Sequence, residues 1–263
     1  MGRRFASRRT ASRAVLRDLT LEIHAREIVA VLGPSGCGKS TLLRIAAGLD
    51  APSSGAVHIN GAPVEPFDPR CAVAFQEPRL LPWRSLADNV ALGLPPRTPT
   101  AQARATVANL LDLVGLTEFA RHRPREVSGG MAQRTSLARA LARGPGVLLL
   151  DEPFGALDAL TRLKMQDLLL DVHTAAPTTV LLVTHDVDEA LQLADRVILL
   201  GSDGDTPGAT IRQTVVVPGP RPRDRGSAQL AELRARLLDG LGVPRHVRTP
   251  DVTALSADHG SPV

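Results

Sequence analysis

Four short runs along the chain are almost entirely apolar and rich in leucine and β-branched residues. Such runs are typical of central parallel strands that are covered on both faces. They span residues 28–32, 72–75, 147–150 and 180–183, and residues 197–200 are a fifth candidate. Helical patterns alternate with these runs, notably at residues 39–48 and 186–194. This alternation predicts an α/β domain with a parallel central sheet.

Two other segments alternate apolar and polar side chains. They are TLEIH at residues 20–24 and AVHIN at residues 56–60. Alternation with a period of two is typical of half-exposed strands, so we expect an antiparallel β region beside the main sheet.

A helical region is predicted between about residues 97 and 144, inserted between strands of the α/β core. Four apolar residues have the i, i+3, i+4, i+7 spacing of one helical face: Val107, Leu110, Leu111 and Val114. A second helix is predicted from about 130 to 143, with three inward residues: Leu137, Ala138 and Leu141.

The chain becomes rich in glycine and proline after Gly201, and residues up to 226 are predicted to be a linker. A short amphipathic helix follows, with five leucines on one face: Leu230, Leu233, Leu237, Leu238 and Leu241. The remaining tail is predicted to be loose. We therefore expect one domain over residues 1–205 and a separate C-terminal segment over residues 206–263.

The composition excludes several classes of protein. With 43% hydrophobic and 22% charged residues the chain is typical of globular proteins. Aromatic residues make up 2% and tyrosine is absent, which argues against aromatic platforms for single-stranded nucleic acid. No apolar run reaches the roughly 18 residues of a membrane span. The cysteines, Cys37 and Cys71, give no disulfide framework and suit a reducing cytosol.

The segment GPSGCGKST has the spacing of a phosphate-binding loop, and it follows a predicted strand and begins a predicted helix. The glycines let successive backbone N–H groups point at phosphate oxygens, and the helix N-terminus adds positive charge. Lys39 is placed to reach the β- and γ-phosphates, and Ser40 to bind Mg²⁺. The nucleotide site predicted here comprises nine residues: Gly33, Pro34, Ser35, Gly36, Cys37, Gly38, Lys39, Ser40 and Thr41.

Polar side chains also end three of the predicted strands. Asp151 and Glu152 follow one strand, His185 follows another, and Gln76 ends a third. Ligands bind at the carboxyl ends of the strands in an open α/β sheet. We predict that Asp151 holds Mg²⁺ through a water molecule and that Glu152 polarises the attacking water. Because these residues converge on one edge beside Lys39, together they predict a catalytic site.

A second helix N-terminus is predicted at Ser128, Gly129 and Gly130. Its free N–H groups and the Ser128 hydroxyl form a site for an anion. Since the chain already has a phosphate-binding loop, this terminus is free to bind the nucleotide of another copy. The alternative is an ordinary serine cap before a helix.

These elements, in this order, resemble the ATP-binding subunit of an ABC transporter over about residues 13–205. The match places Walker A at residues 33–41, the Q-loop glutamine at Gln76 and the switch histidine at His185. The signature comprises Ser128, Gly129, Gly130, Met131, Ala132 and Gln133. Walker B ends at Asp151, with Glu152 after it, and the D-loop comprises Phe154, Gly155, Ala156, Leu157 and Asp158. The resemblance implies a P-loop NTPase core of the RecA type, with antiparallel β and inserted α-helical subdomains.

The resemblance also implies the cofactors and partners. The subunit would use ATP and Mg²⁺, with Ser40, Gln76 and Asp151 at the metal, and would form a homodimer with each ATP between Walker A of one copy and Ser128–Gly130 of the other. It would lie at the cytoplasmic face of the cell membrane and drive two transmembrane permease subunits. A periplasmic or lipid-anchored substrate-binding protein would deliver the substrate to these permease subunits. The subunit would bind no nucleic acid. A soluble cassette ATPase acting on ribosomes or DNA is the alternative of another class.

Residues 75–94, FQEPRLLPWRSLADNVALGL, together with VSGGMAQR at residues 127–134, resemble the nitrate/sulfonate/taurine importer branch, especially its aliphatic sulfonate import ATPases. Taurine and nitrate remain alternative cargoes. In this family the loop after Gln76 meets the transmembrane partner, so Pro78, Pro82 and Trp83 are predicted to form the coupling surface. Packing of Trp83 within the helical region is the alternative.

The sequence departs from the family pattern at two places. Met131 stands where the signature usually has glutamine, so any contact by that side chain is lost. The aromatic residue that usually stacks on adenine is tyrosine, and Phe5 is the one candidate before Phe67. Either Phe5 is the adenine platform, or the reading frame starts further upstream.

Overall fold

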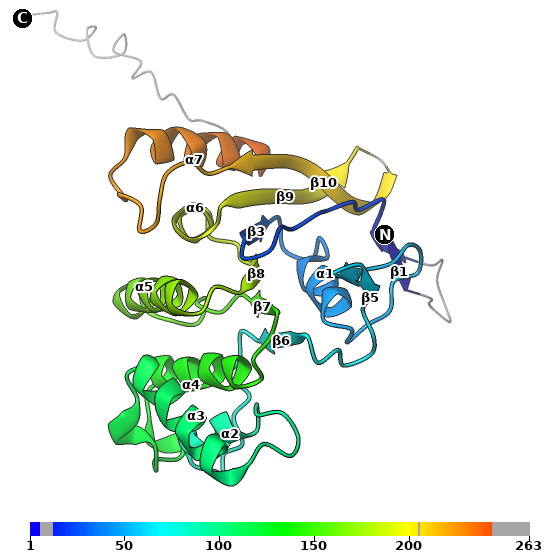
Figure 1. Cartoon of the computed structure of the whole chain (residues 1–263). Coiled ribbons are helices and arrows are strands. Elements are labelled where there is room, and N and C mark those ends of the chain that lie inside the picture. The colour runs from blue at the N-terminus through cyan, green and yellow to red at the C-terminus, as the bar shows by residue number, and fades with distance from the viewer. Residues whose placement is uncertain (6–12, 205, 244–263) are drawn as a thin grey trace, which may run out of the picture.

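The computed structural model describes residues 1–5, 13–204 and 206–243. Its centre is an eight-stranded sheet in the order β1-β2-β10-β9-β3-β8-β7-β6 (Figure 1). The five strands from β9 to β6 run parallel, which confirms the prediction from the apolar runs. They are β3 (Ile28–Leu32), β6 (Cys71–Ala74), β7 (Val147–Asp151), β8 (Thr179–Val183) and β9 (Arg196–Asp203).

Helices cover both faces of the parallel strands, as Figure 1 shows. On β3, Ile28 and Ala30 face one apolar cluster, and Val29 and Val31 face the other. Successive side chains of a strand point to opposite faces, so a strand covered on both sides needs a continuous apolar run. One face carries α1 (Lys39–Ala46), and the other carries α5 (Ala159–Ala175), α6 (Val187–Leu193) and α7 (Ala228–Gly240).

The helical region packs around a core of its own beyond β6 (Figure 1). It begins at Leu86, earlier than the predicted residue 97, because Ser85 caps a six-residue helix that the periodicity is too short to reveal. Val107 and Leu111 of the predicted stripe are buried in this core. Its helices are α2 (Leu86–Ala91), α3 (Thr100–Leu113) and α4 (Gly129–Ala142), with 3₁₀ turns η1 (Thr117–Phe119) and η2 (Pro124–Glu126).

The prediction of a linker over residues 206–226 is wrong for its first half. Strand β10 (Thr206–Val216) pairs antiparallel with β9 along almost its whole length. Pro207 and Gly208, which suggested a linker, lie where the pairing register shifts between Thr206 and Ala209. A bulge of this kind accommodates such residues without ending the strand.

The predicted C-terminal helix is α7, and it packs on the chain's own core. Leu230 and Leu237 are buried in the same apolar cluster as the strands and α6. The C-terminal segment is therefore part of the fold through α7. The tail predicted to be loose, residues 244–263, lies outside the described residues.

The two segments with alternating patterns form less strand than predicted. Residues 20–24 form no strand, because some of their polar backbone atoms bind side chains instead: the His24 N–H donates to Glu27, and the Glu22 carbonyl accepts from Arg196. The second segment contributes only a two-stranded antiparallel sheet, β4 (His58–Ile59) with β5 (Ala62–Pro63). At the edge of the main sheet lie β1 (Arg3–Phe5) and β2 (Arg13–Leu16), paired antiparallel.

Across the described ranges, every helix is too short or too polar to span a lipid bilayer.

Candidate active site

The predicted phosphate-binding loop joins the carboxyl end of β3 to α1. Gly36 and Gly38 have φ values of 75° and 106°, a region that glycine adopts without strain. Lys39 is 6% exposed, and its Nζ donates to the carbonyl oxygens of Gly33 and Pro34 at 2.8 and 3.1 Å. Among the described residues no side chain caps α1, so its first N–H groups are available to an anion.

Ser40 and Asp151 meet across the edge of the sheet, as the resemblance implies for a metal site. The Ser40 hydroxyl donates to Oδ1 of Asp151 at 3.0 Å. Burial raises the pKa of Asp151, the hydrogen bond from Ser40 lowers it, and the charge of Glu152 raises it again. A hydroxyl and a half-buried carboxylate at this distance suit Mg²⁺, which prefers oxygen ligands and is bound with few protein groups.

The described residues contain no cluster of three or more histidine, cysteine, aspartate or glutamate side chains around a possible metal position. The remaining ligands of a Mg²⁺ ion would therefore be hydroxyl, amide, water or phosphate oxygens, as is usual where the ion arrives with a nucleotide.

Glu152 and His185 form a pair at the ends of neighbouring strands. His185 Nδ1 lies 3.1 Å from Oε2 of Glu152. Glu152 has a φ of 46°, in the left-handed region that non-glycine residues rarely adopt, and its N–H is held by the carbonyl of Val183 at 2.9 Å. Strained backbone at an active-site residue orients its side chain at a cost of about 1–3 kcal/mol. The His185 side chain is 61% exposed, so this pair faces solvent.

Gln76 follows β6 and lies at the same edge. A methyl group on Gly155 would be 3.4 Å from Nε2 of Gln76 and 3.7 Å from Oε2 of Glu152. The structure thus brings Gln76, Glu152 and His185 together, as predicted from the strand ends.

The predicted signature begins α4, in the helical region. Ser128 caps this helix, its hydroxyl accepting from the N–H of Met131 at 3.3 Å. Gly130 packs so closely that a Cβ there would lie 2.6 Å from Cγ2 of Thr161 on α5. Between described residues, no hydrogen bond joins Ser128, Gly129, Gly130 or Met131 to the phosphate-binding loop. The two candidate phosphate sites are separate within one chain.

The predicted D-loop leads into α5. Asp158 caps this helix and accepts from the N–H of Thr161 at 3.0 Å, and the contact with Thr161 lowers the pKa of Asp158. Leu157 is buried, whereas Ala156 is exposed. Phe154 is buried as well, so the loop anchors two side chains in the core and exposes Gly155, Ala156 and Asp158.

The segment after Gln76 is held by α4. Gln133 is 4% exposed, and its Nε2 donates to the carbonyl of Phe75 at 3.1 Å. Arg139 donates to the carbonyls of Pro78 and Arg79 at 2.7 and 2.9 Å. A movement of α4 would therefore pull directly on the loop that carries Gln76.

Trp83 projects from this segment and is 67% exposed. Pro82 is exposed beside it and Pro78 is half-buried. The alternative in which Trp83 packs inside the helical region is wrong, because the side chain lies on the surface.

Phe5 ends β1, is 41% exposed and lies under the guanidinium of Arg3, whose Cζ is 4.6 Å from the ring centroid. One face of the ring is therefore occupied by a cation. The following residues, 6–12, lie outside the described ranges.

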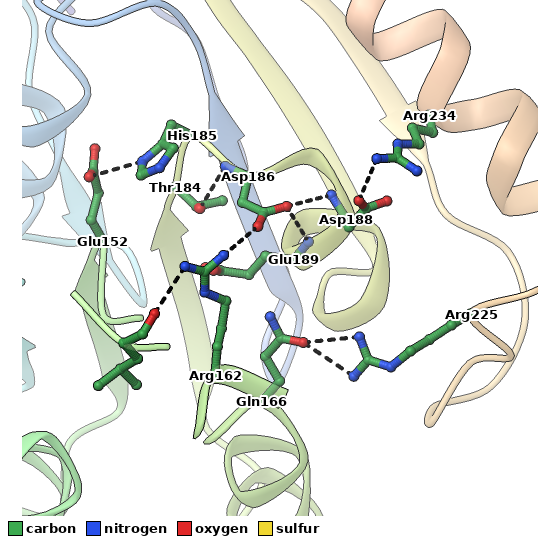
Figure 2. A network of polar contacts seen from close by, with 11 residues as sticks. Glu152, Arg162, Gln166, Thr184, His185, Asp186, Asp188, Glu189, Arg225 and Arg234 are labelled. Carbon is green, nitrogen blue, oxygen red and sulfur yellow. Dashed lines mark hydrogen bonds and ion pairs between the residues drawn. The ribbon is translucent and has the colours of Figure 1, made fainter. Parts of the chain in front are cut away.

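Three residues beside the candidate site were not singled out from the sequence: Arg162, Asp186 and Glu189 (Figure 2). Arg162 joins the D-loop to Asp186, the residue after His185. Glu189 is 3% exposed, and burial, followed by the negative charge of Asp186, raises its pKa to about 8. The available signal was Asp186, a helix-capping residue directly beside the predicted histidine.

Comparison with known proteins adds family information. The family model described as ABC transporter matches residues 16–155. The aliphatic sulfonates import ATP-binding protein SsuB 2 of Burkholderia lata is 52% identical over 86% of this chain and 81% of its own length. The nitrate import ATP-binding protein NrtD of Synechococcus elongatus is 45% identical over 86% of this chain and 84% of its own.

Solved structures agree with these matches. The dimeric structure of MJ0796, a bacterial ABC transporter cassette, superposes with a TM-score of 0.71 at 31% identity, covering 83% of this chain and 97% of that one. A dimeric post-hydrolysis state of the same cassette, bound to ADP and Pi, also matches with a TM-score of 0.71.

Proposed function

Since the chain belongs to the ABC transporter family, we propose that it powers the import of aliphatic sulfonates. Members of this family bind and hydrolyse ATP, and this chain is such an ATPase. The main support for an ATPase site here is structural: Lys39, the Ser40–Asp151 pair and the Glu152–His185 pair lie together at one edge of the sheet. The cargo rests on the relatives, several of which are named for aliphatic sulfonate import at 50–52% identity.

The first step is binding of the nucleotide phosphates by residues 33–41. Lys39 would exchange its carbonyl partners, Gly33 and Pro34, for β- and γ-phosphate oxygens. The free N–H groups of α1 would bind the same phosphates. Phe5 is proposed as the adenine platform, through the ring face that Arg3 leaves open.

Mg²⁺ fits the Ser40–Asp151 pair, with Gln76 as a third candidate ligand. When bound, such an ion neutralises charge on the phosphates during phosphoryl transfer. Ser40 and Asp151 already lie within hydrogen-bond distance, so they need little rearrangement to share a ligand.

Hydrolysis requires water to attack the γ-phosphate in line with the leaving oxygen. We assign Glu152 to polarise that water and His185 to orient Glu152 and contact the phosphate. Support for these roles is the 3.1 Å contact between the two side chains and the strained backbone of Glu152. Gln76, on a loop held by α4, would link this site to the helical region.

Two copies complete the site in this proposal. Ser128 and Gly129 are exposed at the start of α4, with Gly130 buried behind them, and this terminus suits the nucleotide of a second copy. Met131 lacks the amide of the usual glutamine and would make no polar side-chain contact, and Ala156, Leu157 and Asp158 would lie near the junction. The dimeric structures of MJ0796 support this arrangement.

The exposed Trp83 and Pro82, with Pro78, form the proposed docking surface for two transmembrane permease subunits. The subunit would then lie peripherally on the cytoplasmic face of the membrane, and a periplasmic or lipid-anchored binding protein would deliver the cargo.

The test is growth of cells that lack this protein, with an aliphatic sulfonate, taurine or nitrate as the limiting nutrient. We expect failure on the sulfonate, rescue by wild type and by Glu232→Gln on the exposed face of α7, and no rescue by Glu152→Gln. Failure on taurine or nitrate alone would reassign the cargo to that compound. Growth on all three would refute this set of cargoes and leave the ATPase assignment standing.

A further inference from the structure

Arg162, in the first turn of α5, connects two loops that both reach the catalytic edge. Its Nη2 donates to the carbonyl of Leu157 in the D-loop at 3.1 Å, and its Nη1 donates to Oδ2 of Asp186 at 3.3 Å (Figure 2). The side chains of Arg162 and Asp186 are 32% and 28% exposed, so the ion pair is partly shielded from water. Glu152 begins the first of these loops, and His185 lies in the second.

Asp186 transmits that contact to the backbone around His185. Its Oδ1 accepts from the N–H groups of Asp188 and Glu189 at 2.9 and 3.2 Å, and its own N–H donates to Oγ1 of Thr184 at 3.0 Å. Thr184 is 2% exposed. His185 therefore lies between two residues whose positions are tightly determined, and any shift of Asp186 moves its backbone.

The far end of α6 is also fixed. Arg223 donates to the carbonyls of Leu191 and Gln192 at 3.0 and 3.1 Å, and Arg221 donates to that of Leu193 at 2.9 Å. Cations at the carbonyl end of a helix satisfy its unpaired acceptors. With α6 held there, the Arg162–Asp186 contact ties its N-terminal loop directly to the D-loop.

Glu189 lies beside this contact, where burial and the charge of Asp186 raise its pKa and the charge of Arg162 lowers it. Its Oε1 is buried and, among the described residues, has no hydrogen-bond partner. A raised pKa favours the neutral form of this carboxyl, and the neutral form does not compete with Asp186 for the guanidinium.

We propose that Arg162 is a positioning residue for ATP hydrolysis, which holds His185 against Glu152 by tying Asp186 to the D-loop. The exposed His185 side chain makes a direct contact with Glu152, so its alignment depends on the backbone that Arg162 holds. This inference rests on the proposed role of His185.

The test measures steady-state ATP hydrolysis by the purified full chain and its variants, with kcat and KM determined separately. We expect Arg162→Ala to lower kcat by about 10- to 100-fold, because small misplacements of catalytic groups have effects of this size. KM for ATP should change by less than about threefold, since residues 33–41 are untouched. Arg162→Lys should recover part of kcat, because lysine keeps the charge but not the two-armed geometry.

The matched control is Arg225→Ala. Arg225 also binds α5, donating to Oε1 of Gln166 at 3.2 Å, but it touches neither loop. We expect wild-type kcat from this variant. An equal loss of kcat in Arg225→Ala and Arg162→Ala would show a general effect on α5 and overturn the proposal.

A double-mutant cycle with Asp186→Asn tests the pathway, since asparagine preserves the helix cap and removes the ion pair. We expect Arg162→Ala to have little further effect in the Asp186→Asn background, and additive losses would overturn the proposal. An independent readout is the ¹⁵N signal of the His185 ring, assigned with His185→Ala. Arg162→Ala should shift it toward the value in Glu152→Gln, and an unchanged signal would contradict the positioning role.

The variant His185→Ala distinguishes the proposed role of His185 from the proposed role of Arg162. Normal hydrolysis by this variant would refute the proposed function of His185 itself. Loss of hydrolysis by His185→Ala with wild-type kcat in Arg162→Ala would refute only the inference about Arg162.

Discussion

The helices α1 and α4 both begin with glycine-rich segments suited to phosphate, yet they are built into different cores. Leu42 and Leu43 of α1 pack against one face of the parallel sheet. In α4, Ala138 and Ala142 pack in the core of the helical region, and Leu137 and Ala140 pack in the cluster on the other face of the sheet. The N-terminus of α1 has no side-chain cap among the described residues, whereas Ser128 caps α4. One terminus is thus ready to receive phosphate, and the other is stabilised in its absence.

This difference shows how one chain can hold two half-sites without joining them. The α1 site takes its rigidity from buried strands. The α4 site belongs to the helical region, which binds the loop around Gln76 through Gln133 and Arg139. Motion of the helical region would then be felt at Gln76 before it reaches Lys39.

Lys39→Ala should produce the largest effect, because it removes the buried positive charge of the α1 site. We expect ATP turnover to fall by about 100-fold or more, as for loss of other groups that stabilise transition-state charge. Phosphate release measures the turnover, and titration with a fluorescent ATP analogue measures nucleotide binding. The matched control is Lys164→Ala, which removes the one other lysine, an exposed residue on α5. Comparable losses in both variants would contradict the prediction.

Substitutions at the two signature glycines should separate folding from function at α4. A Cβ on Gly130 meets Thr161 at 2.6 Å, whereas a Cβ on Gly129 meets nothing within 4 Å. We expect Gly130→Ala to destabilise the fold by about 1–3 kcal/mol, through overpacking. Gly129→Ala should leave the melting temperature equal or higher, since alanine favours helix.

Thr161→Ser supplies the control for Gly130→Ala, because it removes the clashing methyl group and keeps the hydroxyl. The double variant should recover most of the lost melting temperature. If Gly129→Ala lowers ATP turnover without lowering the melting temperature, the loss indicates a contact with another copy of the chain. If both Gly129→Ala and Gly130→Ala lower the melting temperature, the predicted difference between the two positions is wrong.

Replacing the buried Glu189 of the α/β core with glutamine should change how the stability of the fold depends on pH. Glutamate has a pKa near 4.5 when unfolded, and burial raises the pKa of Glu189 to about 8 in the fold. Between these pH values the folded state keeps a proton that the unfolded state has released, so stability falls as pH rises, by at most about 1.4 kcal/mol per unit. The glutamine variant lacks this loss.

The measurement is the difference in melting temperature between Glu189→Gln and wild type from pH 5 to pH 8. It should increase in favour of the variant across that window, whereas the exposed Glu232→Gln should follow wild type throughout. A constant difference would mean that Glu189 is ionised in the folded protein.

Trp83→Ala should have the smallest effect on the isolated chain. With 67% of the residue exposed, we expect the free energy of unfolding to change by less than about 0.5 kcal/mol. Chemical denaturation measures this, and nutrient uptake in cells should fall if Trp83 contacts a membrane partner. A large loss of stability would show that the covered part of the Trp83 side chain stabilises the fold, and would contradict this prediction.

The sequence predicted the parallel strands because each is buried on both faces, which demands a continuous apolar run. It predicted the meeting of Gln76, Glu152 and His185 because parallel strands end at one edge. The strand β10 was not predicted, because Pro207 and Gly208 suggested a break and because the buried side chains of this strand follow no regular alternation. The pair Arg162–Asp186 spans 24 residues and depends on two loop conformations, which no local pattern encodes.

The pairing of β2 with β10 has a consequence for synthesis of the chain. Ala209 aligns with Leu16, and its carbonyl binds the N–H of Arg17 at 2.9 Å. Since about 190 residues separate these partners, the amino-terminal strands emerge from the ribosome roughly 10 to 40 s before β10 exists. During that interval β2 has an unpaired edge open to other chains. Crowding, temperature and chaperone supply during translation should therefore affect the yield of folded protein more than they affect the stability of the folded chain.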